Sequence, residues 1–329
     1  MKSEDHGNTY ELKTDRAGQF VQTGLRTGVY SITLKAGDQV VMQNYKFRVS
    51  SGENKVSINL KELKEQQEKE NAGMAEERKK REEESNKFES MKTHFEAGVT
   101  ALTESRQLGA QIQRTPPAER GPLQERQTQA LQTAITELEA SAKAAPANDP
   151  NLHKVYANLG QAYEAAGRFQ DAASAYEKAI ALKAEPGYYL GLGTSLARMG
   201  KADEAGAACD KATALDKTIS ASCWRNIGIV FYNTGKMAEA VAPLRKASEL
   251  EPTNAQTWYL LGASLVNTMT AKVEGDKVIP ILQPGTIEAY QKCIEVDGEG
   301  PYGQQCKQGM DQLQAMGVGI QTKVKAKKK

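Results

Sequence analysis

The chain has 329 residues, room for about two domains, and 26% of them are charged while only 6% are aromatic. Its 43 basic and 41 acidic residues give a net charge of +2, which excludes a strong overall field towards nucleic acid or anionic membrane. No run approaches the roughly 18 apolar residues of a membrane-spanning helix, and the residues after Met1 lack the apolar core of a signal peptide.

Residues 10–60 alternate between apolar and polar side chains, the pattern of strands with one buried face. The turn sequences AGDQ and SGEN divide this stretch. We expect three strands, with these residues on their buried faces: Tyr30, Ile32 and Leu34; Tyr45, Phe47 and Val49; Val56, Ile58 and Leu60.

Charge dominates the next segment, residues 61–87, where 17 of 27 residues are charged, eight positive and nine negative. Opposite charges three or four positions apart favour a solvated helix. Too few apolar residues fall at heptad positions a and d for a coiled coil. We therefore predict a helical spacer, weakened at Gly73 because glycine within a helix costs about 1 kcal/mol relative to alanine.

An internal repeat follows, in which Gly160, Gly193, Gly228 and Gly262 fall in register at spacings of 33, 35 and 34 residues. The third copy, SCWRNIGIVFYNTGKMAEAVAPLRKASELEPTN, resembles the tetratricopeptide repeat, a helix-turn-helix unit, through the following residues: Trp224, Ile227, Gly228, Phe231, Gly235, Ala240, Leu244, Ala247 and Pro252. One such unit cannot bury its apolar face alone, so the resemblance implies that the repeats stack into a solenoid.

Two segments resemble interrupted repeats. Residues 257–267 fit a first helix whose partner begins only at Thr286, and the insertion, residues 270–285, predicts a small hairpin around its EGD turn. Residues 88–150 resemble a degenerate first unit, with Ser141 where the pattern prefers alanine and a Pro-containing segment that loops out or extends the helices. Residues 301–317 fit a helix that caps the solenoid.

The four cysteines, Cys209, Cys223, Cys293 and Cys306, are far apart in the sequence and form no C-x-x-C pair. The few histidines do not accompany them, so neither a zinc site nor a disulfide framework is expected. We expect the cysteines to be small buried side chains in helices, and Trp224 and Trp258 to lie in the core of the repeats.

No pattern indicates catalysis, a metal site or a cofactor. The glycines around Gly191 imitate a nucleotide-binding loop, but they follow a helix, and Gly193 is the repeat glycine. The VEGDK stretch lacks the closing glutamate of a calcium loop. We therefore predict a protein that is not an enzyme and that carries no metal and no cofactor.

The tetratricopeptide resemblance implies that the first helix of each repeat lines a concave binding groove. Residues at the matching positions are Gln161, Glu164, Leu190, Thr194, Arg198, Arg225, Ile229, Tyr232, Asn233, Tyr259 and Asn267. Arg225, Tyr232 and Tyr259 are the strongest candidates for partner binding, since arginine and tyrosine most often anchor protein interfaces. The alternative is that these side chains only solvate the inner face.

Residues 14–30, TDRAGQFVQTGLRTGVY, have the spacing T-D-x-x-G-x-F-x-x-x-G-L-x-x-G-x-Y. This stretch resembles the carboxypeptidase-regulatory-like domain, a prealbumin-type β-sandwich. The resemblance implies that the glycines make turns and that Phe20, Leu25 and Tyr30 fill the core between two sheets. The opening strands of that family have no counterpart here, and we expect them, after a signal peptide, to be encoded upstream of Met1.

The chain is thus expected to be an α+β multidomain protein. The expected parts are an incomplete β-sandwich at 1–60, a charged helical linker at 61–87, a degenerate tetratricopeptide unit at 88–150, an all-α solenoid with its inserted loop and capping helix at 151–316, and a basic disordered tail at 317–329.

This order of parts resembles exported bacterial proteins of unknown function, which implies the cell envelope or periplasm; a chain that starts at Met1 would be cytoplasmic. The expected function is a non-catalytic adaptor that binds a protein or peptide partner, with no nucleic acid and no membrane span. A cytoplasmic assembly scaffold and an accessory subunit of an enzyme complex are the alternatives. The partner's identity and the oligomeric state stay open.

Overall fold

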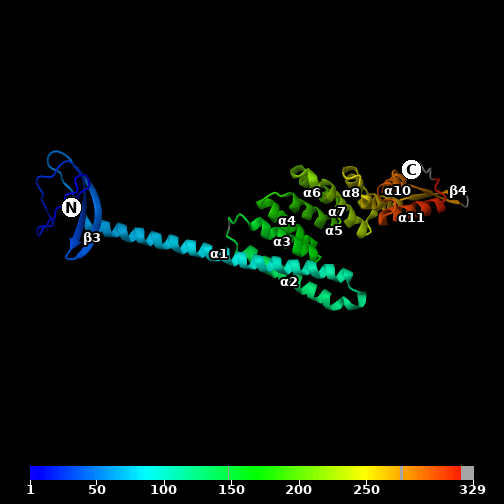
Figure 1. Cartoon of the computed structure of the whole chain (residues 1–329), viewed down its shortest axis with the longest axis horizontal. Helices are drawn as coiled ribbons and strands as arrows, with labels where there is room; N and C mark the ends of the chain where they lie inside the picture. The colour runs from blue at the N-terminus through cyan, green and yellow to red at the C-terminus, as the bar shows by residue number, and fades with distance from the viewer. Residues whose placement is uncertain (147, 275–276, 320–329) are drawn as a thin grey trace. The chain divides into compact units, whose positions relative to one another are not determined.

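The computed structural model of the chain describes residues 1–146, 148–274 and 277–319. Most of the expected basic tail, residues 320–329, lies outside the described residues. The chain divides into two compact units, Met1–Lys80 and Arg81–Lys329, and the long helix α1 runs from the first into the second (Figure 1).

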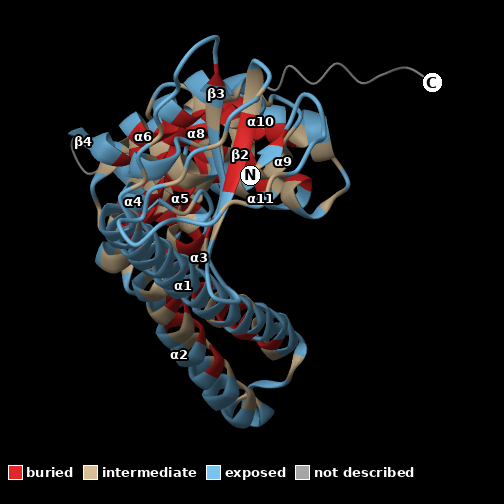
Figure 2. Cartoon of the chain, turned by 90° about the vertical axis from the view of Figure 1, so that its left-hand side faces the viewer, coloured by how far each residue is buried: buried red, intermediate tan, exposed pale blue. Residues whose placement is uncertain are grey.

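The first unit contains one antiparallel sheet with the strand order β1-β2-β3. Its strands are β1, Lys2–Ser3; β2, Gly28–Ala36; and β3, Gln39–Val49. Tyr30 on β2 pairs with Phe47 on β3 and is 1% exposed, and the buried part of β2 is red in Figure 2. The two strands predicted around these residues are therefore confirmed, but Tyr45, expected on the buried face, is 37% exposed.

The third predicted strand, around Ile58, is wrong. Residues 53–59 form no strand, and Leu60 is the first residue of a helix. The Asn59 side chain accepts a hydrogen bond from the Lys61 backbone N–H at 3.1 Å, so it caps this helix, which takes Leu60 out of the alternating pattern. Residues 1–59, all described, contain no second sheet, so a β-sandwich is not confirmed.

Helix α1, Leu60–Arg114, is continuous over 55 residues and passes Gly73 without a break. The charged segment predicted to be a helical spacer is its first half, and residues 64–90 are exposed to solvent. The ion pair between Lys80 and Glu76, at 3.0 Å, has the four-residue spacing that supports a solvated helix.

The second half of α1 packs antiparallel to α2, Gly121–Ala144. Gly98 lies against Leu138, because a Cβ on this glycine would be 2.6 Å from the leucine side chain. The Ser141 hydroxyl donates to the Met91 carbonyl at 2.9 Å, which accounts for serine where the repeat pattern prefers alanine. The Pro-containing segment extends both helices and turns through a short 3-10 helix, Pro117–Glu119.

Four helix pairs follow, each with a first and a second helix, and Figure 1 shows them in succession along the second unit. The pairs are α3, Leu152–Ala165, with α4, Phe169–Leu182; α5, Pro186–Arg198, with α6, Ala202–Leu215; α7, Ser220–Asn233, with α8, Met237–Leu250; and α9, Ala255–Asn267, with α10, Thr286–Asp297. A short 3-10 helix, Lys217–Ile219, precedes α7, and α11, Pro301–Ala315, follows the last pair at the position predicted for a capping helix.

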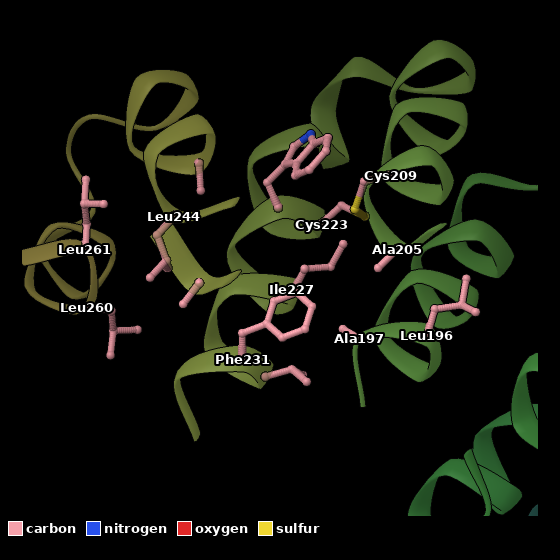
Figure 3. Packing of buried hydrophobic residues seen from close by; sticks show 14 of the residues in the cluster. Leu196, Ala197, Ala205, Cys209, Cys223, Ile227, Phe231, Leu244, Leu260 and Leu261 are labelled. Atoms are coloured by element: carbon pink, nitrogen blue, oxygen red, sulfur yellow. A yellow bond between two sulfur atoms is a disulfide. The ribbon is translucent and has the colours of Figure 1, made fainter. Parts of the chain in front are cut away.

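The buried residues of the pairs form three clusters, which the partly buried side chains of Leu192 and Tyr259 link from one repeat to the next. Ile227 and Phe231 of α7 lie between the side chains of α5 and α6 on one side and Leu244 of α8 on the other (Figure 3). Trp224 is 8% exposed and belongs to the same cluster, as predicted. This continuity is what stacked repeats require, because no single pair buries its own apolar face.

The insertion between α9 and α10 contains the two paired strands of the predicted hairpin, whereas residues 275 and 276 of its EGD turn lie outside the described residues. Strand β4, Thr270–Glu274, pairs antiparallel with β5, Lys277–Ile281. The side chains of β4 are exposed, and Val273 is 70% exposed.

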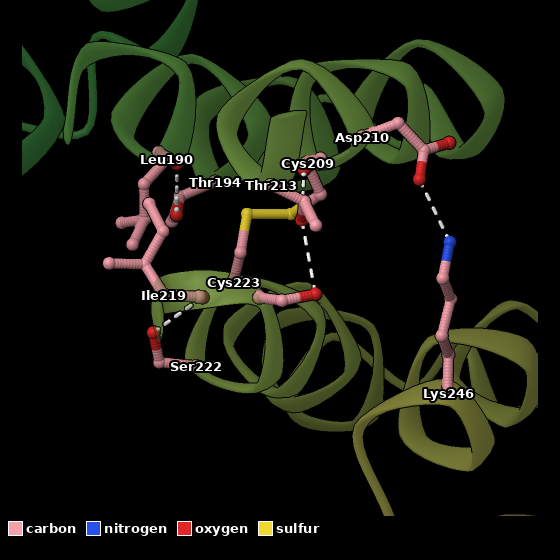
Figure 4. Close-up of a disulfide and its surroundings, with 10 residues drawn as sticks. Leu190, Thr194, Cys209, Asp210, Thr213, Ile219, Ser222, Cys223 and Lys246 are labelled. Carbon is pink, nitrogen blue, oxygen red and sulfur yellow. Dashed lines mark hydrogen bonds and ion pairs between the residues drawn. A yellow bond between two sulfur atoms is a disulfide. The ribbon is translucent and has the colours of Figure 1, made fainter. Parts of the chain in front are cut away.

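The expectation that the cysteines stay unpaired is wrong. Cys209 bonds to Cys223, with their Cα atoms 5.8 Å apart (Figure 4). Cys293 bonds to Cys306, with their Cα atoms 6.3 Å apart. Each bond joins the second helix of one repeat to the first helix of the next unit. The paired cysteines are 14 and 13 positions apart in the sequence. The tight connection between their helices folds the two helices back on each other, which brings the cysteines within bonding distance.

Candidate binding surface

The eleven residues expected in the groove all lie on α3, α5, α7 and α9, the first helices of the four repeats. Arg198, Asn233 and Asn267 are exposed, and the other eight are half-buried. We call the surface made by these eleven side chains the first-helix face. The side chains of this face are therefore partly exposed to solvent, where a partner could contact them, and partly packed against neighbouring residues.

Glu164 is the acidic centre at the α3 end of this face. The Tyr176 hydroxyl, which comes from the second helix α4, donates to the Glu164 carboxylate at 3.3 Å. Burial raises the pKa of Glu164, while this hydrogen bond and the positive charge of Arg198 act in the opposite direction. Arg106 of α1 donates to the Gln161 side chain, so the degenerate unit also contributes to the surface here.

Tyr176 reaches the face through a slot that two glycines leave open. A Cβ on Gly160 of α3 would lie 3.0 Å from its ring, and a Cβ on Gly191 of α5 would lie 2.3 Å from it. Only glycine leaves space for a tyrosine ring between these two first helices. The glycines that imitate a nucleotide-binding loop therefore have a packing role.

In the last repeat, a second-helix tyrosine ring also packs between two glycines. The ring of Tyr290, on α10, lies between Gly262 of α9 and Gly309 of α11, whose Cβ atoms would be 2.7 and 2.8 Å from it. In the two repeats that have Cys209 or Leu244 at the equivalent position, the next first helix has Asn226 or Leu260 in place of the second glycine. Tyrosine and the second glycine thus occur together.

Four tyrosines meet around the α9 end of the face: Tyr232, Tyr259, Tyr290 and Tyr302. The rings of Tyr259 and Tyr302 lie 6.0 Å apart between centroids. Burial raises the pKa of Tyr232, and the neighbouring Tyr259 side chain adds to this shift. Burial raises the pKa of Tyr290 to about 12, and the phenols of Tyr259 and Tyr232 add to this shift. We call these four residues the tyrosine cluster.

Arg225 lies between the two ends of the face and forms an ion pair with Glu251, which follows the last residue of α8. Thr194 and Asn267 instead hydrogen-bond to carbonyls of their own helices, Leu190 at 3.0 Å and Ala263 at 2.9 Å. The structure thus brings Glu164 near Arg198 and Tyr232 near Tyr259, whereas Thr194 and Asn267 form no cross-helix hydrogen bond within the described part of the chain.

Sequence reasoning missed several residues of this surface, namely Arg106, Tyr176, Glu251, Tyr290 and Tyr302. The pairing of a second-helix tyrosine with an extra glycine in the next first helix is a signal that could have indicated Tyr176 and Tyr290. No comparable signal exists for Arg106, because its place depends on how α1 packs against the first repeat.

Other kinds of site are not evident in the structure. Across residues 1–146, 148–274 and 277–319, no group of three or more His, Cys, Asp and Glu side chains is placed to hold a metal ion. None of the helices in that part of the chain combines the length and apolarity needed to cross a bilayer. Surface cavities of about 580 and 340 Å³ lie beside α1 and beside the hairpin, and none of the eleven residues of the first-helix face lines either one.

The helix pairs, their in-register glycines and their continuous core define a helical-repeat solenoid. Residues 157–218 match the family model described as tetratricopeptide repeat. Residues 157–218 therefore carry the tetratricopeptide repeat pattern that the sequence indicated.

Solved structures similar to the chain include YrrB, described as a tetratricopeptide repeat protein with an unusual peptide-binding site. The sequence identity is 18% and the TM-score is 0.37, and the match covers 54% of this chain and 84% of the YrrB chain. MamA is similar at 16% identity and a TM-score of 0.39 over 71% and 98% of the two chains. The first tetratricopeptide domain of Spaghetti (RPAP3), bound to an HSP90 peptide, is similar at 22% identity and a TM-score of 0.30 over 35% and 92%. No protein of curated function matches the sequence significantly.

Proposed function

We propose that the protein is a non-catalytic adaptor that binds a protein or peptide partner through the concave, first-helix face of its repeats. The observation that carries this proposal is the set of half-buried aromatic and polar side chains there, above all Tyr232 and Tyr259. Solenoid repeats use such extended surfaces for binding, and tyrosine and arginine are common anchors of protein interfaces.

The proposed location is an oxidising compartment of the cell envelope. All four cysteines are paired, and each is at most 1% exposed. Disulfides persist in secreted and periplasmic proteins and are rare in the cytosol, where thiols are kept reduced. The pairing therefore favours the envelope over the cytoplasmic alternative.

The first unit is proposed to be part of a carboxypeptidase-regulatory-like module that docks to a second surface. Two of its motif glycines, Gly18 and Gly24, have positive φ angles of 77° and 74°, as turn-forming glycines in that motif would, while Gly28 begins strand β2. The Asp15 carboxylate accepts hydrogen bonds from the Ala17 and Gln19 N–H groups at 2.9 and 2.8 Å, which fixes the first turn. Tyr30, expected in the core, is buried.

A capture experiment tests the binding surface. The full chain is used as bait in an envelope fraction beside two variants of equal charge change. Asn233→Arg with Asn267→Arg alters exposed residues of the first-helix face, and Ala181→Arg with Ala214→Arg alters exposed residues of second helices. The proposal predicts partners that are lost only from the first variant. Loss from the second variant alone, or equal retention by both, would contradict it.

A further inference from the structure

We propose that the tyrosine cluster is a subsite for an uncharged, proline-rich segment of the partner, held in the extended polyproline II conformation. This inference rests on the proposed function, because it assigns a ligand chemistry to one end of the first-helix face. Four different helices supply the subsite: α7, α9, α10 and α11.

The cluster is ordered by the fold before any ligand arrives. Tyr290 is 4% exposed and is fixed between Gly262 and Gly309, and a Cβ on Gly309 would lie 3.0 Å from its hydroxyl oxygen. Tyr259 contacts Tyr302 at a ring separation of 6.0 Å, and Tyr232 and Tyr259 both pack against the same buried core cluster. Side chains that are already ordered lose little conformational freedom on binding, so the face of the cluster is preorganised for a ligand.

The chemistry of the cluster is that of hydroxyl donors on apolar rings, without charge. A phenol hydroxyl is a donor as well as an acceptor, so the half-buried tyrosines can donate to a carbonyl of a ligand. Among the described residues, the causes that raise the pKa of Tyr290 are burial and two other phenols, with no carboxylate or ammonium group. Arg225, on the same face, is already paired with Glu251. The four phenols offer no counter-ion to a charged ligand, and the Asp297 carboxylate beside Tyr302 already accepts hydrogen bonds from the Tyr302 and Gly303 backbone N–H groups, at 3.0 and 3.2 Å.

A polyproline II segment matches these properties. It has no internal hydrogen bonds, so its carbonyls accept from outside donors, and its rigid backbone loses little entropy on binding. Proline rings pack on aromatic side chains, as they do in other aromatic-lined grooves that recognise proline-rich segments. Within this chain the Trp258 indole N–H donates to the Pro252 carbonyl at 2.8 Å, an internal example of an aromatic donor bonded to a proline carbonyl.

The inference is tested by fluorescence anisotropy with the purified full chain and three labelled peptides of equal length. One consists of Ala-Pro-Pro units, one of Ala-Gly-Ser units and one of Ala-Lys units. We expect the proline peptide to bind at least about tenfold more tightly than the glycine-serine peptide, with little change in affinity on adding salt. Preferred binding of the lysine peptide would point to cation–π capture and would overturn the inference.

Variants locate the binding. Tyr259→Ala is expected to weaken the proline peptide about tenfold or more, as the loss of an aromatic anchor does. Tyr232→Phe and Tyr259→Phe keep the rings and the packing and remove only the hydroxyls, so we expect a few-fold loss with unchanged thermal stability. Ala214→Arg, exposed on the second helix α6 and outside the first-helix face, should leave the affinity unchanged. Equal affinity in all four variants would overturn the inference.

The result of the peptide-binding test can be distinguished from the result of the capture experiment that tests the proposed function. If the first-helix variants lose a cellular partner while no proline peptide binds, the subsite assignment fails and the binding surface stands. If the proline peptide binds and its affinity falls in Tyr259→Ala, but no partner depends on the first-helix face, the subsite is real and the adaptor function fails.

Discussion

Gly191 of α5 lies directly against the ring of Tyr176 of α4, because a Cβ on this glycine would be 2.3 Å from the tyrosine Cζ. The glycine thus lets a second-helix tyrosine pass between two first helices and deliver its hydroxyl to Glu164. The position of the Tyr176 hydroxyl on the first-helix face therefore depends on Gly191 having no side chain.

Gly191→Ala is predicted to destabilise the protein by about 1–3 kcal/mol, the usual cost of overpacking a filled site. Urea unfolding followed by circular dichroism measures this change. Gly187→Ala, in the same helix, is the matched control, since a Cβ there meets nothing within 4 Å. Alanine has the higher helix propensity, so the control should be neutral or slightly stabilising. Equal destabilisation by both changes would show that the Tyr176 slot is not what requires glycine.

The two disulfides are predicted to stabilise the repeats by about 3 kcal/mol each, the value expected for closed loops of this length in the chain-entropy model. Unfolding of the wild type is compared with that of the double variants Cys209→Ala with Cys223→Ala and Cys293→Ala with Cys306→Ala. Thiol labelling of the protein isolated from cells under acid quench should find no free cysteine. Four labelled thiols in the folded protein would contradict both the pairing and the proposed envelope location.

His153 makes the first two repeats sensitive to acid. It is 4% exposed and its Nδ1 lies 2.7 Å from the Tyr188 hydroxyl of α5, and burial lowers its pKa below the usual value near 6.5. The unfolded chain therefore takes up this proton more readily than the folded chain does. The stability that depends on neutral His153 is present above about pH 6.5 and is lost as the pH falls below it.

The measurement is the midpoint of urea unfolding between pH 8 and pH 5. We expect His153→Gln to flatten the decrease of stability at acid pH relative to the wild type. His6→Gln is the control, since His6 is exposed and should leave the slope as it is. An unchanged slope in His153→Gln would remove His153 as the cause.

The sequence predicted the repeats well because their packing is local and periodic. The glycines at Gly160, Gly193, Gly228 and Gly262 recur with the helix pairs, and the hairpin after α9 followed from a length difference and an EGD turn. The strand expected at Ile58 failed because a short alternating stretch before a charged helix is compatible with two structures. There the Asn59 cap decides between them.

The candidate surface was predictable only in part. Positions on the first helices follow from the repeat pattern, but contributions from second helices and from α1 depend on packing between units. Tyr290 and Arg106 belong to this class. The disulfides were missed for the same reason, since Cys209 and Cys223 are near each other only once α6 and α7 stack. Tertiary contact, rather than sequence spacing, decides these features.

Site-specific photo-crosslinking in cells tests the central claim, binding through the first-helix face, most directly. A benzophenone amino acid is placed at Asn233, exposed on α7, or at Ala214, exposed on the second helix α6. If a partner binds through the first-helix face, we expect a discrete protein adduct from position 233 and none from position 214. Mass spectrometry maps the crosslink. Adducts that form only from position 214, or equally from both positions, would contradict it.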